Sequence, residues 1–216
     1  MSENVFLFVP NIIGYIRIIC IAVASLNMVS NHWIAVIFYM MASLLDGLDG
    51  FTARKLNQCS RFGALLDIIT DICVSNVCLL SCLCHLYPQY MVLFQLSMVL
   101  EVSSRWLLTQ STAMIGIKNI KERDYTKESR LIELYYKNKV FLGAVCIGND
   151  LFFAMLYLTY FTTGPHVGSL GLFELLMYLS APFSLVMFAV GVAILILASK
   201  SIVRLDISER NVCKHD

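Results

Sequence analysis

Four aspartates lie within a short and otherwise mostly apolar stretch, LLDGLDGFTARKLNQCSRFGALLDIITD, which begins at residue 44. Asp46 and Asp49 are three residues apart, and Asp67 and Asp71 are four apart, so each pair shares one face of a helix. Four carboxylates brought together would force some of them to take up protons, unless cations compensate their charge. Hard oxygen ligands suit Mg²⁺ or Mn²⁺. The spacing therefore predicts a divalent-metal site for two ions, as in enzymes that displace phosphoryl groups.

The residues around the acids suit a phosphate ligand. Gly50 and Ala53 extend the face of the first acid pair and leave room beside it. Gly63 lies four residues before Asp67 on the same stripe, where a small residue permits close approach of a helix or a nucleotide. Arg54 can bind phosphate oxygens through two parallel hydrogen bonds. Together these residues indicate a substrate that carries phosphate.

A structural explanation of the acids is ion pairing with the basic turn between the two pairs, at Arg54, Lys55 and Arg61. Such pairing would account for one or two acids at a helix end. It does not account for four acids at paired helical spacings, beside small residues on matching faces. Acids in apolar membrane surroundings are costly and usually functional, so we expect a functional cluster.

The composition is that of a polytopic membrane protein. Of 216 residues, 58% are hydrophobic and 14% are charged, against about a quarter charged in soluble domains. The net charge of +1 and the lack of a basic arm argue against a nucleic-acid partner. We predict an all-α single membrane domain over residues 1–216, with six transmembrane helices. Runs long enough to span a bilayer lie near 9–29, 33–54, 62–86, 89–116, 139–162 and 171–203.

Charge in the connections predicts the orientation of these helices. The connections near 30–32, 87–90 and 163–170 contain no Lys or Arg, whereas the other connections and the C-terminal end are basic. By the positive-inside rule, both termini lie in the cytosol. Residues 117–138 are then a cytosolic loop and residues 204–216 a cytosolic tail. The same orientation puts the acid pairs, and hence the active site, at the cytosolic ends of helices two and three.

The acids and their neighbours form a pattern with eight fixed positions: D-x-x-D-G-x-x-A-R, eight residues, then G-x-x-x-D-x-x-x-D. This pattern resembles the signature of the CDP-alcohol phosphatidyltransferase family. Stretches such as NVFLFVPNIIGYIRI and GPHVGSLGLF are similar to animal members that use myo-inositol. The resemblance implies a homodimer in the endoplasmic reticulum membrane. The implied reaction transfers the phosphatidyl group of CDP-diacylglycerol to myo-inositol, giving phosphatidylinositol and CMP.

The resemblance also implies roles for individual residues. Asp46, Asp49, Asp67 and Asp71 would form the metal-binding set, in which the first three hold the metals and Asp71 contributes to the cluster. Asp71 would in addition be the catalytic base that takes the proton from the inositol hydroxyl, as general-base catalysis requires. Positions that bind the CDP-lipid in the family correspond to Gly50, Arg54 and Ser60. From the residues alone, Ser60 is equally well explained as a turn or helix-cap residue.

Polar residues in other spans have two explanations each. Arg17, in the element PNIIGYIR, could extend to the cytosolic interface or reach the substrate phosphate, and we favour the phosphate. Glu101 and Arg105 are four residues apart, and a structural ion pair explains them well. Asn149 could bind across helices or line the inositol pocket.

Two positions depart from the animal members of the family. Ile72 follows the last aspartate, where those members have arginine, and Arg105 precedes Trp106, where they have histidine. These departures leave open another alcohol acceptor, or a catalytically impaired paralogue that binds CDP-diacylglycerol. A divalent-cation transporter is a third alternative, but it would need acids nearer the middle of the membrane.

Overall fold

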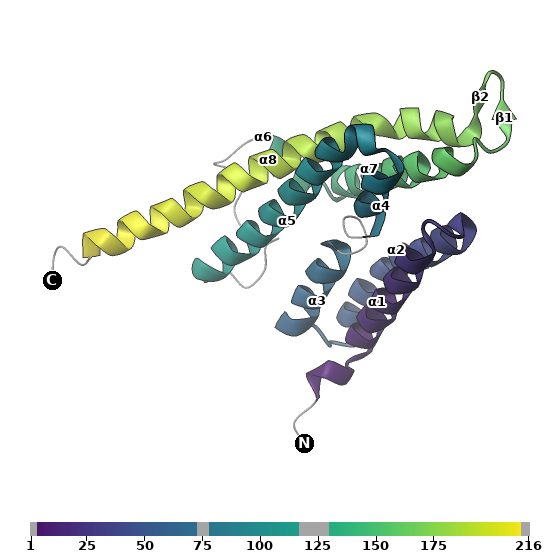
Figure 1. Cartoon of the computed structure of the whole chain (residues 1–216). Coiled ribbons are helices and arrows are strands. Elements are labelled where there is room, and N and C mark those ends of the chain that lie inside the picture. Colours follow the sequence, from purple (N-terminus) through teal and green to yellow (C-terminus); the bar gives the residue numbers. More distant parts are fainter. Residues whose placement is uncertain (1–3, 73–77, 117–129, 213–216) are drawn as a thin grey trace. The chain divides into compact units, whose positions relative to one another are not determined.

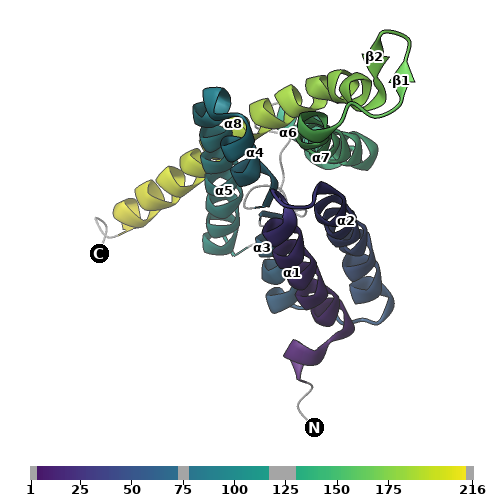
Figure 2. The same cartoon turned by 45° about the vertical axis from the view of Figure 1, so that its right-hand side comes forward.

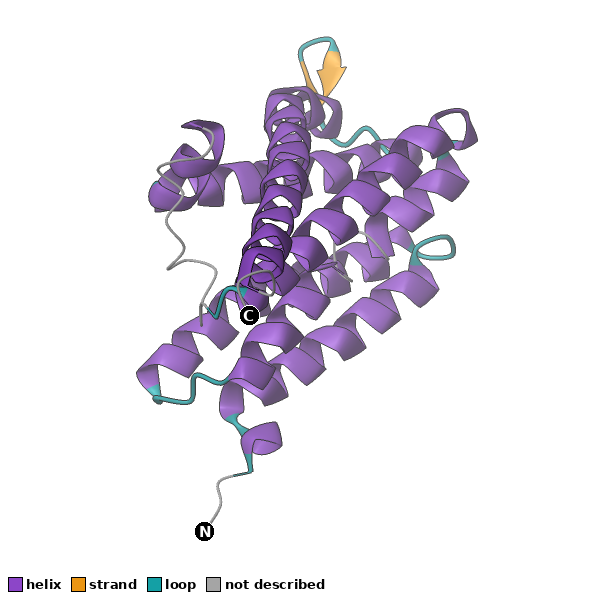
Figure 3. Cartoon of the chain, turned by 90° about the vertical axis from the view of Figure 1, so that its left-hand side faces the viewer, coloured by secondary structure: helices purple, strands orange, loops and turns teal. Residues whose placement is uncertain are grey.

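The computed structural model describes residues 4–72, 78–116 and 130–212. Helices make up nearly all of this part of the chain (Figure 3), and its only strands are the short antiparallel pair β1 (His166–Val167) and β2 (Leu170–Gly171). The chain divides into two compact units, which are described one at a time. The first holds Met1–Gln95 and Phe153–Phe173, and the second holds Leu96–Phe152 and Glu174–Asp216.

Five helices in the described part are long and apolar enough to cross a membrane. They are α1 (Val9–Asn27), α2 (His32–Lys55), α5 (Met91–Met114), α7 (Lys139–Phe161) and α8 (Leu172–Val212). Each begins and ends close to one of the predicted runs, except that α8 continues further. The prediction of an all-α polytopic membrane protein is therefore confirmed.

The third predicted run, residues 62–86, is not one helix in the structure. It contains α3 (Arg61–Ile72) and α4 (Ser81–Leu86), with residues 78–80 in π-helical conformation before α4. Residues 73–77 lie outside the described part. Five of the six expected spans are thus single helices in the described part, and the third is represented by the two shorter helices α3 and α4.

In the first unit, α1 and α2 lie side by side along their length (Figures 1 and 2). Both helices bury small residues: Ala24 of α1 and Ala35 and Ala42 of α2 are fully buried. Lipid offers apolar helices no hydrophobic reason to associate, so membrane helices pack closely where small side chains let their backbones approach. The pairing places the end of α2, with its two acids, beside the start of α1.

The opposite end of this helix pair is held by polar contacts. The Asn31 side chain caps α2 by accepting a hydrogen bond from the Ile34 backbone N–H at 3.2 Å. The Tyr157 hydroxyl, from the last turns of α7, donates to the Met28 carbonyl at 2.7 Å. The His32 ring stacks on Phe161 at 4.8 Å between centroids. These contacts fix the α1–α2 connection, so that the two helices reach their other end in a defined register.

The second unit packs around one apolar cluster from four helices. Its buried members are Leu108, Tyr135, Val145, Val190, Ile194 and Ala198. Gly148 permits close packing there, because a Cβ atom at this position would lie 2.5 Å from the Phe183 ring.

The structure adds helices to two segments expected to be loop and tail. Helix α6 (Arg130–Lys137) occupies the end of the predicted cytosolic loop 117–138, whose residues 117–129 lie outside the described part. Ile132 and Tyr135 are three residues apart on one face of α6, and both are buried in the second unit. Burial raises the pKa of the Tyr135 phenol, which therefore stays neutral. Helix α8 continues to Val212, through most of the predicted tail 204–216.

Candidate functional site

The first acid pair lies near the C-terminal end of α2. Asp46 and Asp49 share a helix face, with the Asp49 side chain 10% exposed and the Asp46 side chain 46% exposed. Arg54 and Lys55 occupy the last turn, where cations interact favourably with the helix dipole. Asn57 ends the helix in left-handed conformation at φ 54°. Backbone bonds from Asn57 to Arg54 and from Gln58 to Ala53 complete a Schellman motif, so the chain reverses sharply toward α3.

The second acid pair lies on α3, directly after this reversal. Ser60 is the N-cap of α3, because its hydroxyl oxygen accepts a hydrogen bond from the Gly63 backbone N–H at 2.9 Å. The helix-cap explanation of Ser60 is thereby confirmed, and its contact with the CDP-lipid stays a prediction. Asp67 and Asp71 follow on one face of α3, with side chains 48% and 33% exposed.

Two glycines allow α1 and α3 to approach each other. A Cβ atom at Gly63 would lie 2.8 Å from the Asn11 side-chain oxygen, and one at Gly14 would lie 2.8 Å from Leu66. Asn11 is 1% exposed, and its amide donates to the Val5 carbonyl at 2.6 Å, so this side chain has little freedom to move aside. Gly63 therefore serves the close approach of a helix, one of the two explanations offered by the sequence.

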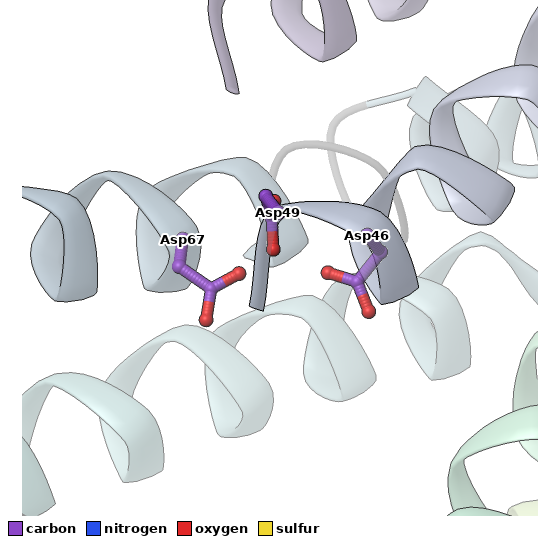
Figure 4. A group of neighbouring side chains, drawn as sticks. All are labelled: Asp46, Asp49 and Asp67. Atoms are coloured by element: carbon purple, nitrogen blue, oxygen red, sulfur yellow. The ribbon is translucent and has the colours of Figure 1, made fainter. Parts of the chain in front are cut away.

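The carboxylates of α2 and α3 converge. Figure 4 shows Asp46 and Asp49 from α2 and Asp67 from α3 directed into the same space, and one oxygen from each lies within 4.8 Å of the others. Such a set of three hard oxygen donors fits Mg²⁺ or Mn²⁺. Asp46 and Asp67 are about half exposed, so an ion and its ligands can reach the site from outside. The predicted cluster of acids is therefore present, and its donors fit a divalent cation.

Arg17 of α1 contacts all four aspartates. Its Nη1 atom lies 2.6 Å from Asp49 Oδ2 and 3.2 Å from Asp67 Oδ1. Its Nη2 atom lies 2.7 Å from Asp46 Oδ1 and 2.8 Å from Asp71 Oδ1. Each terminal nitrogen thus bridges one acid of α2 and one acid of α3. These contacts bring Asp71 into the cluster with the other three.

The sequence placed Arg17 in a stretch that resembles a family element near the active site, but it did not reveal that Arg17 contacts the aspartates. The side chain is 1% exposed, so the alternative in which it extends to the interface is wrong. The available signal was a lone arginine in an apolar span, about two turns from the start of that span. Since a buried charge needs partners, the nearest acids were the ones to consider.

Gly50 and Arg54 lie together on the face that continues beyond Asp46 and Asp49. A Cβ atom at Gly50 would lie 3.5 Å from Arg54 Nη1, which places the guanidinium over the glycine. Arg54 is exposed and forms no ion pair among the described residues. A five-donor fork beside an open stretch of helix can bind phosphate oxygens.

Two polar positions of the second unit were assigned possible roles from the sequence, the Glu101–Arg105 pair and Asn149. Arg105 Nη2 binds Glu101 Oε1 at 3.1 Å, which confirms the predicted ion pair within α5. Asn149 is buried, with 5% of its surface exposed, within the same unit. Its proposed place in an inositol pocket stays a prediction.

Comparison with known proteins identifies the family. The sequence profile of CDP-alcohol phosphatidyltransferases matches residues 7–203. The chain is 42% identical over 209 residues to the CDP-diacylglycerol–inositol 3-phosphatidyltransferases of Mus musculus and Homo sapiens, covering 97% of this chain and 97% of each relative. It is 39% identical over 168 residues to the Saccharomyces cerevisiae protein of the same name, covering 77% of this chain and 75% of that relative. No solved structure matches. With its signature aspartates gathered at one place and this likeness over its whole length, the chain belongs to the CDP-alcohol phosphatidyltransferase family.

Proposed function

We propose that this protein transfers the phosphatidyl group of CDP-diacylglycerol to myo-inositol, giving phosphatidylinositol and CMP. The observation that carries the proposal is the convergence of the family's signature aspartates, Asp46, Asp49 and Asp67, on one space. Relatives from animals and from Schizosaccharomyces pombe that match nearly the whole chain are named for this reaction. Relatives from Saccharomyces cerevisiae and Arabidopsis thaliana, which match 77% and 72% of the chain, carry the same reaction in their names.

Asp46, Asp49, Asp67 and Asp71 form the set that would hold the metal, as two ions; the first three would be its principal ligands. Bound divalent ions would neutralise charge on the pyrophosphate and on the departing CMP. Arg54, whose guanidinium lies over Gly50, is placed to bind phosphate oxygens of the CDP-lipid. Ser60 would contact the same lipid from the start of α3, in addition to capping that helix.

Asp71 is the proposed general base. In the reaction, an inositol hydroxyl oxygen forms a bond to the phosphorus that carries the diacylglycerol. The anhydride bond from that phosphorus to CMP breaks, and the hydroxyl proton passes to the Asp71 carboxylate. The Asp71 side chain is one-third exposed. Such exposure suits a group that must meet a soluble substrate.

The molecular setting follows from the same family membership and from the charge pattern. We propose six membrane crossings, in which the segment containing α3 and α4 supplies the third. We also propose one domain over residues 1–216, both termini in the cytosol, residence in the endoplasmic reticulum membrane and a homodimer. The basic residues that flank the aspartates, Arg54, Lys55 and Arg61, support a cytosolic position for the cluster.

Ile72 and Arg105 keep a second acceptor under consideration. Ile72 directly follows the proposed base in the chain, at the last residue of α3. An apolar side chain there offers no hydrogen bond to a polyol. Inositol remains the favoured acceptor because the likeness to inositol-using relatives extends over 97% of the chain.

One assay tests the function and its alternatives. Purified protein in detergent receives CDP-diacylglycerol and Mn²⁺ or Mg²⁺, and CMP release is measured with inositol, glycerol phosphate, serine or choline. We expect release with inositol that stops when EDTA is added. Faster CMP release with another alcohol would show that this alcohol, and not inositol, is the acceptor. Binding of CDP-diacylglycerol with no CMP release for any alcohol would indicate the impaired paralogue, and Mn²⁺ uptake into vesicles without lipid binding would indicate a transporter.

A further inference from the structure

Both terminal nitrogens of Arg17 are engaged by the aspartate cluster, through hydrogen bonds to Asp49, Asp67 and Asp71 and a close ion pair with Asp46. The two terminal nitrogens carry four N–H groups, and the structure gives them four carboxylate oxygens, one from each aspartate. Among the described residues, the remaining donor, Nε, has no hydrogen-bond partner. The guanidinium therefore lies at the common centre of the four acids.

The position of Arg17 conflicts with metal ligation by the same acids. A divalent ion such as Mg²⁺ takes its oxygen ligands at about 2.0–2.1 Å, whereas Arg17 nitrogens lie 2.6–3.2 Å from one oxygen of every acid. An ion ligated by Asp46, Asp49 and Asp67 would lie within a few ångströms of the guanidinium. Two cations so close repel each other strongly in surroundings with little water. The guanidinium must then give up some of these contacts when an ion binds.

We propose that Arg17 is a positioning residue that gathers the four aspartates from α2 and α3 and competes with the divalent cation for their oxygens. The inference rests on the proposed function, because it takes the aspartates to be the metal site. It adds that the chain carries its own cation for that site, on a third helix. Arg17 neutralises one of the four carboxylate charges and holds the two acid-bearing helices in register until an ion takes its place.

Competition between Arg17 and the ion predicts the direction in which metal affinity changes when the charge of Arg17 is removed. Removing the charge of Arg17 leaves the four acids without their internal cation, which destabilises the protein when metal is withheld. It also removes the cation that opposes the ion. Both effects favour the metal-bound protein, so metal affinity should rise. If Arg17 instead shared the site with the ion and only organised it, its loss would weaken metal binding.

The test is isothermal titration of Mn²⁺ into purified protein in detergent, without substrate. We expect Arg17→Met to bind Mn²⁺ at least tenfold more tightly than the wild type. In EDTA its thermal midpoint should be lower than that of the wild type, and Mn²⁺ should raise that midpoint by more. Arg17→Gln is a second neutral variant, for use if the methionine protein does not fold. Arg17→Lys keeps the charge and should stay within about threefold of the wild-type affinity.

Two controls define the readout. Lys137→Met removes a cation of α6 that is paired with Glu133, and should leave Mn²⁺ affinity unchanged. Asp67→Asn removes a proposed ligand and should weaken binding. Equal or weaker Mn²⁺ affinity in both neutral variants overturns the role of Arg17 and leaves the proposed function standing. No Mn²⁺ binding by the wild type or any variant overturns the metal site itself, and the inference with it.

Discussion

At the scale of single residues, the four signature aspartates are not equivalent. The Asp49 side chain is 10% exposed, whereas those of Asp46 and Asp67 are nearly half exposed. Three of the acids offer oxygens within 4.8 Å of one another, and Asp71 shares the Nη2 atom of Arg17 with Asp46. The proposed reaction divides the acids between metal ligation and proton transfer, with Asp71 in the second role.

This division predicts the behaviour of Asp71→Asn. The amide cannot accept the hydroxyl proton, so kcat should fall at least a hundredfold, within the range typical of a lost general base. Binding of CDP-diacylglycerol in the presence of Mg²⁺ should remain within a few-fold of the wild type, because three acids still ligate metal. Isothermal titration with CDP-diacylglycerol and the CMP-release assay measure the two quantities.

The control for that experiment is Asp206→Asn, which makes the same change at an exposed position of α8 and should alter neither quantity. Complete loss of CDP-diacylglycerol binding by Asp71→Asn would mean that Asp71 acts mainly as a metal ligand. The proton would then need another acceptor, such as a group on the substrate.

Substitution by alanine should affect thermal stability differently at two glycines of the signature. At Gly50 the added methyl meets only Arg54 atoms at 3.5–4.0 Å, which is ordinary contact, so thermal stability should not fall. At Gly63 the methyl would lie 2.8 Å from the buried Asn11 oxygen, and overpacking of this kind costs about 1–3 kcal/mol. Gly63→Ala should therefore lower the thermal midpoint in detergent.

The same pair tests where the CDP-lipid binds. Because the methyl of Gly50→Ala occupies the space assigned to the lipid, the KM for CDP-diacylglycerol should rise while the KM for inositol changes less. An unchanged KM for CDP-diacylglycerol would remove Gly50 from the lipid site. A stable Gly63→Ala protein would contradict the close approach of α1 and α3.

At the scale of elements, the turn between α2 and α3 sets the distance between the acid pairs. The Schellman motif at Asn57 ends one helix, and the Ser60 cap begins the next only three residues later. The Gln58 side chain also accepts a hydrogen bond from the Val9 backbone N–H at 3.0 Å, which ties the turn to the start of α1. A short, fully bonded turn leaves the two acid-bearing helices little freedom to separate.

The cap predicts a stability effect at Ser60. Loss of an N-cap hydroxyl costs about 1 kcal/mol, so Ser60→Ala should lower the thermal midpoint by a few degrees. Ser60→Thr keeps a capping hydroxyl and should resemble the wild type. Thermal denaturation of the three proteins in EDTA isolates the cap from any effect of metal. Equal midpoints for all three would mean that the cap contributes nothing to stability.

At the scale of the whole molecule, the basic residues predict an orientation in the membrane that glycosylation reporters can test. An Asn-x-Thr glycosylation reporter inserted after Ser169, between β1 and β2, should be modified in microsomes, because that connection has no Lys or Arg. The same reporter inserted after Asn57, or added at the C-terminus, should remain unmodified. Modification at Asn57 would place the acid cluster on the lumenal side and contradict the proposed topology.

The sequence alone was sufficient for the class of protein, the metal-type cluster and the family. Apolar runs predict spanning helices because a bilayer demands about 20 such residues, and five of the expected spans appear with nearly the expected bounds. The acids could be paired because helical periodicity relates residues three and four apart. Both inferences depend on local spacing along the chain, which a sequence displays directly.

Tertiary structure decided which groups meet across helices. Arg17 is 29 residues from Asp46 and 54 from Asp71, and nothing in its local pattern states that it contacts both. Its place depends on the packing of α1 against α2, both of which bury small residues, and on the approach of α3 at Gly63. Likewise, residues that were expected to be part of a loop form helix α6, which buries Ile132 and Tyr135 against other helices. Such contacts are chosen by the free energy of packing the whole unit, which no short stretch of sequence contains.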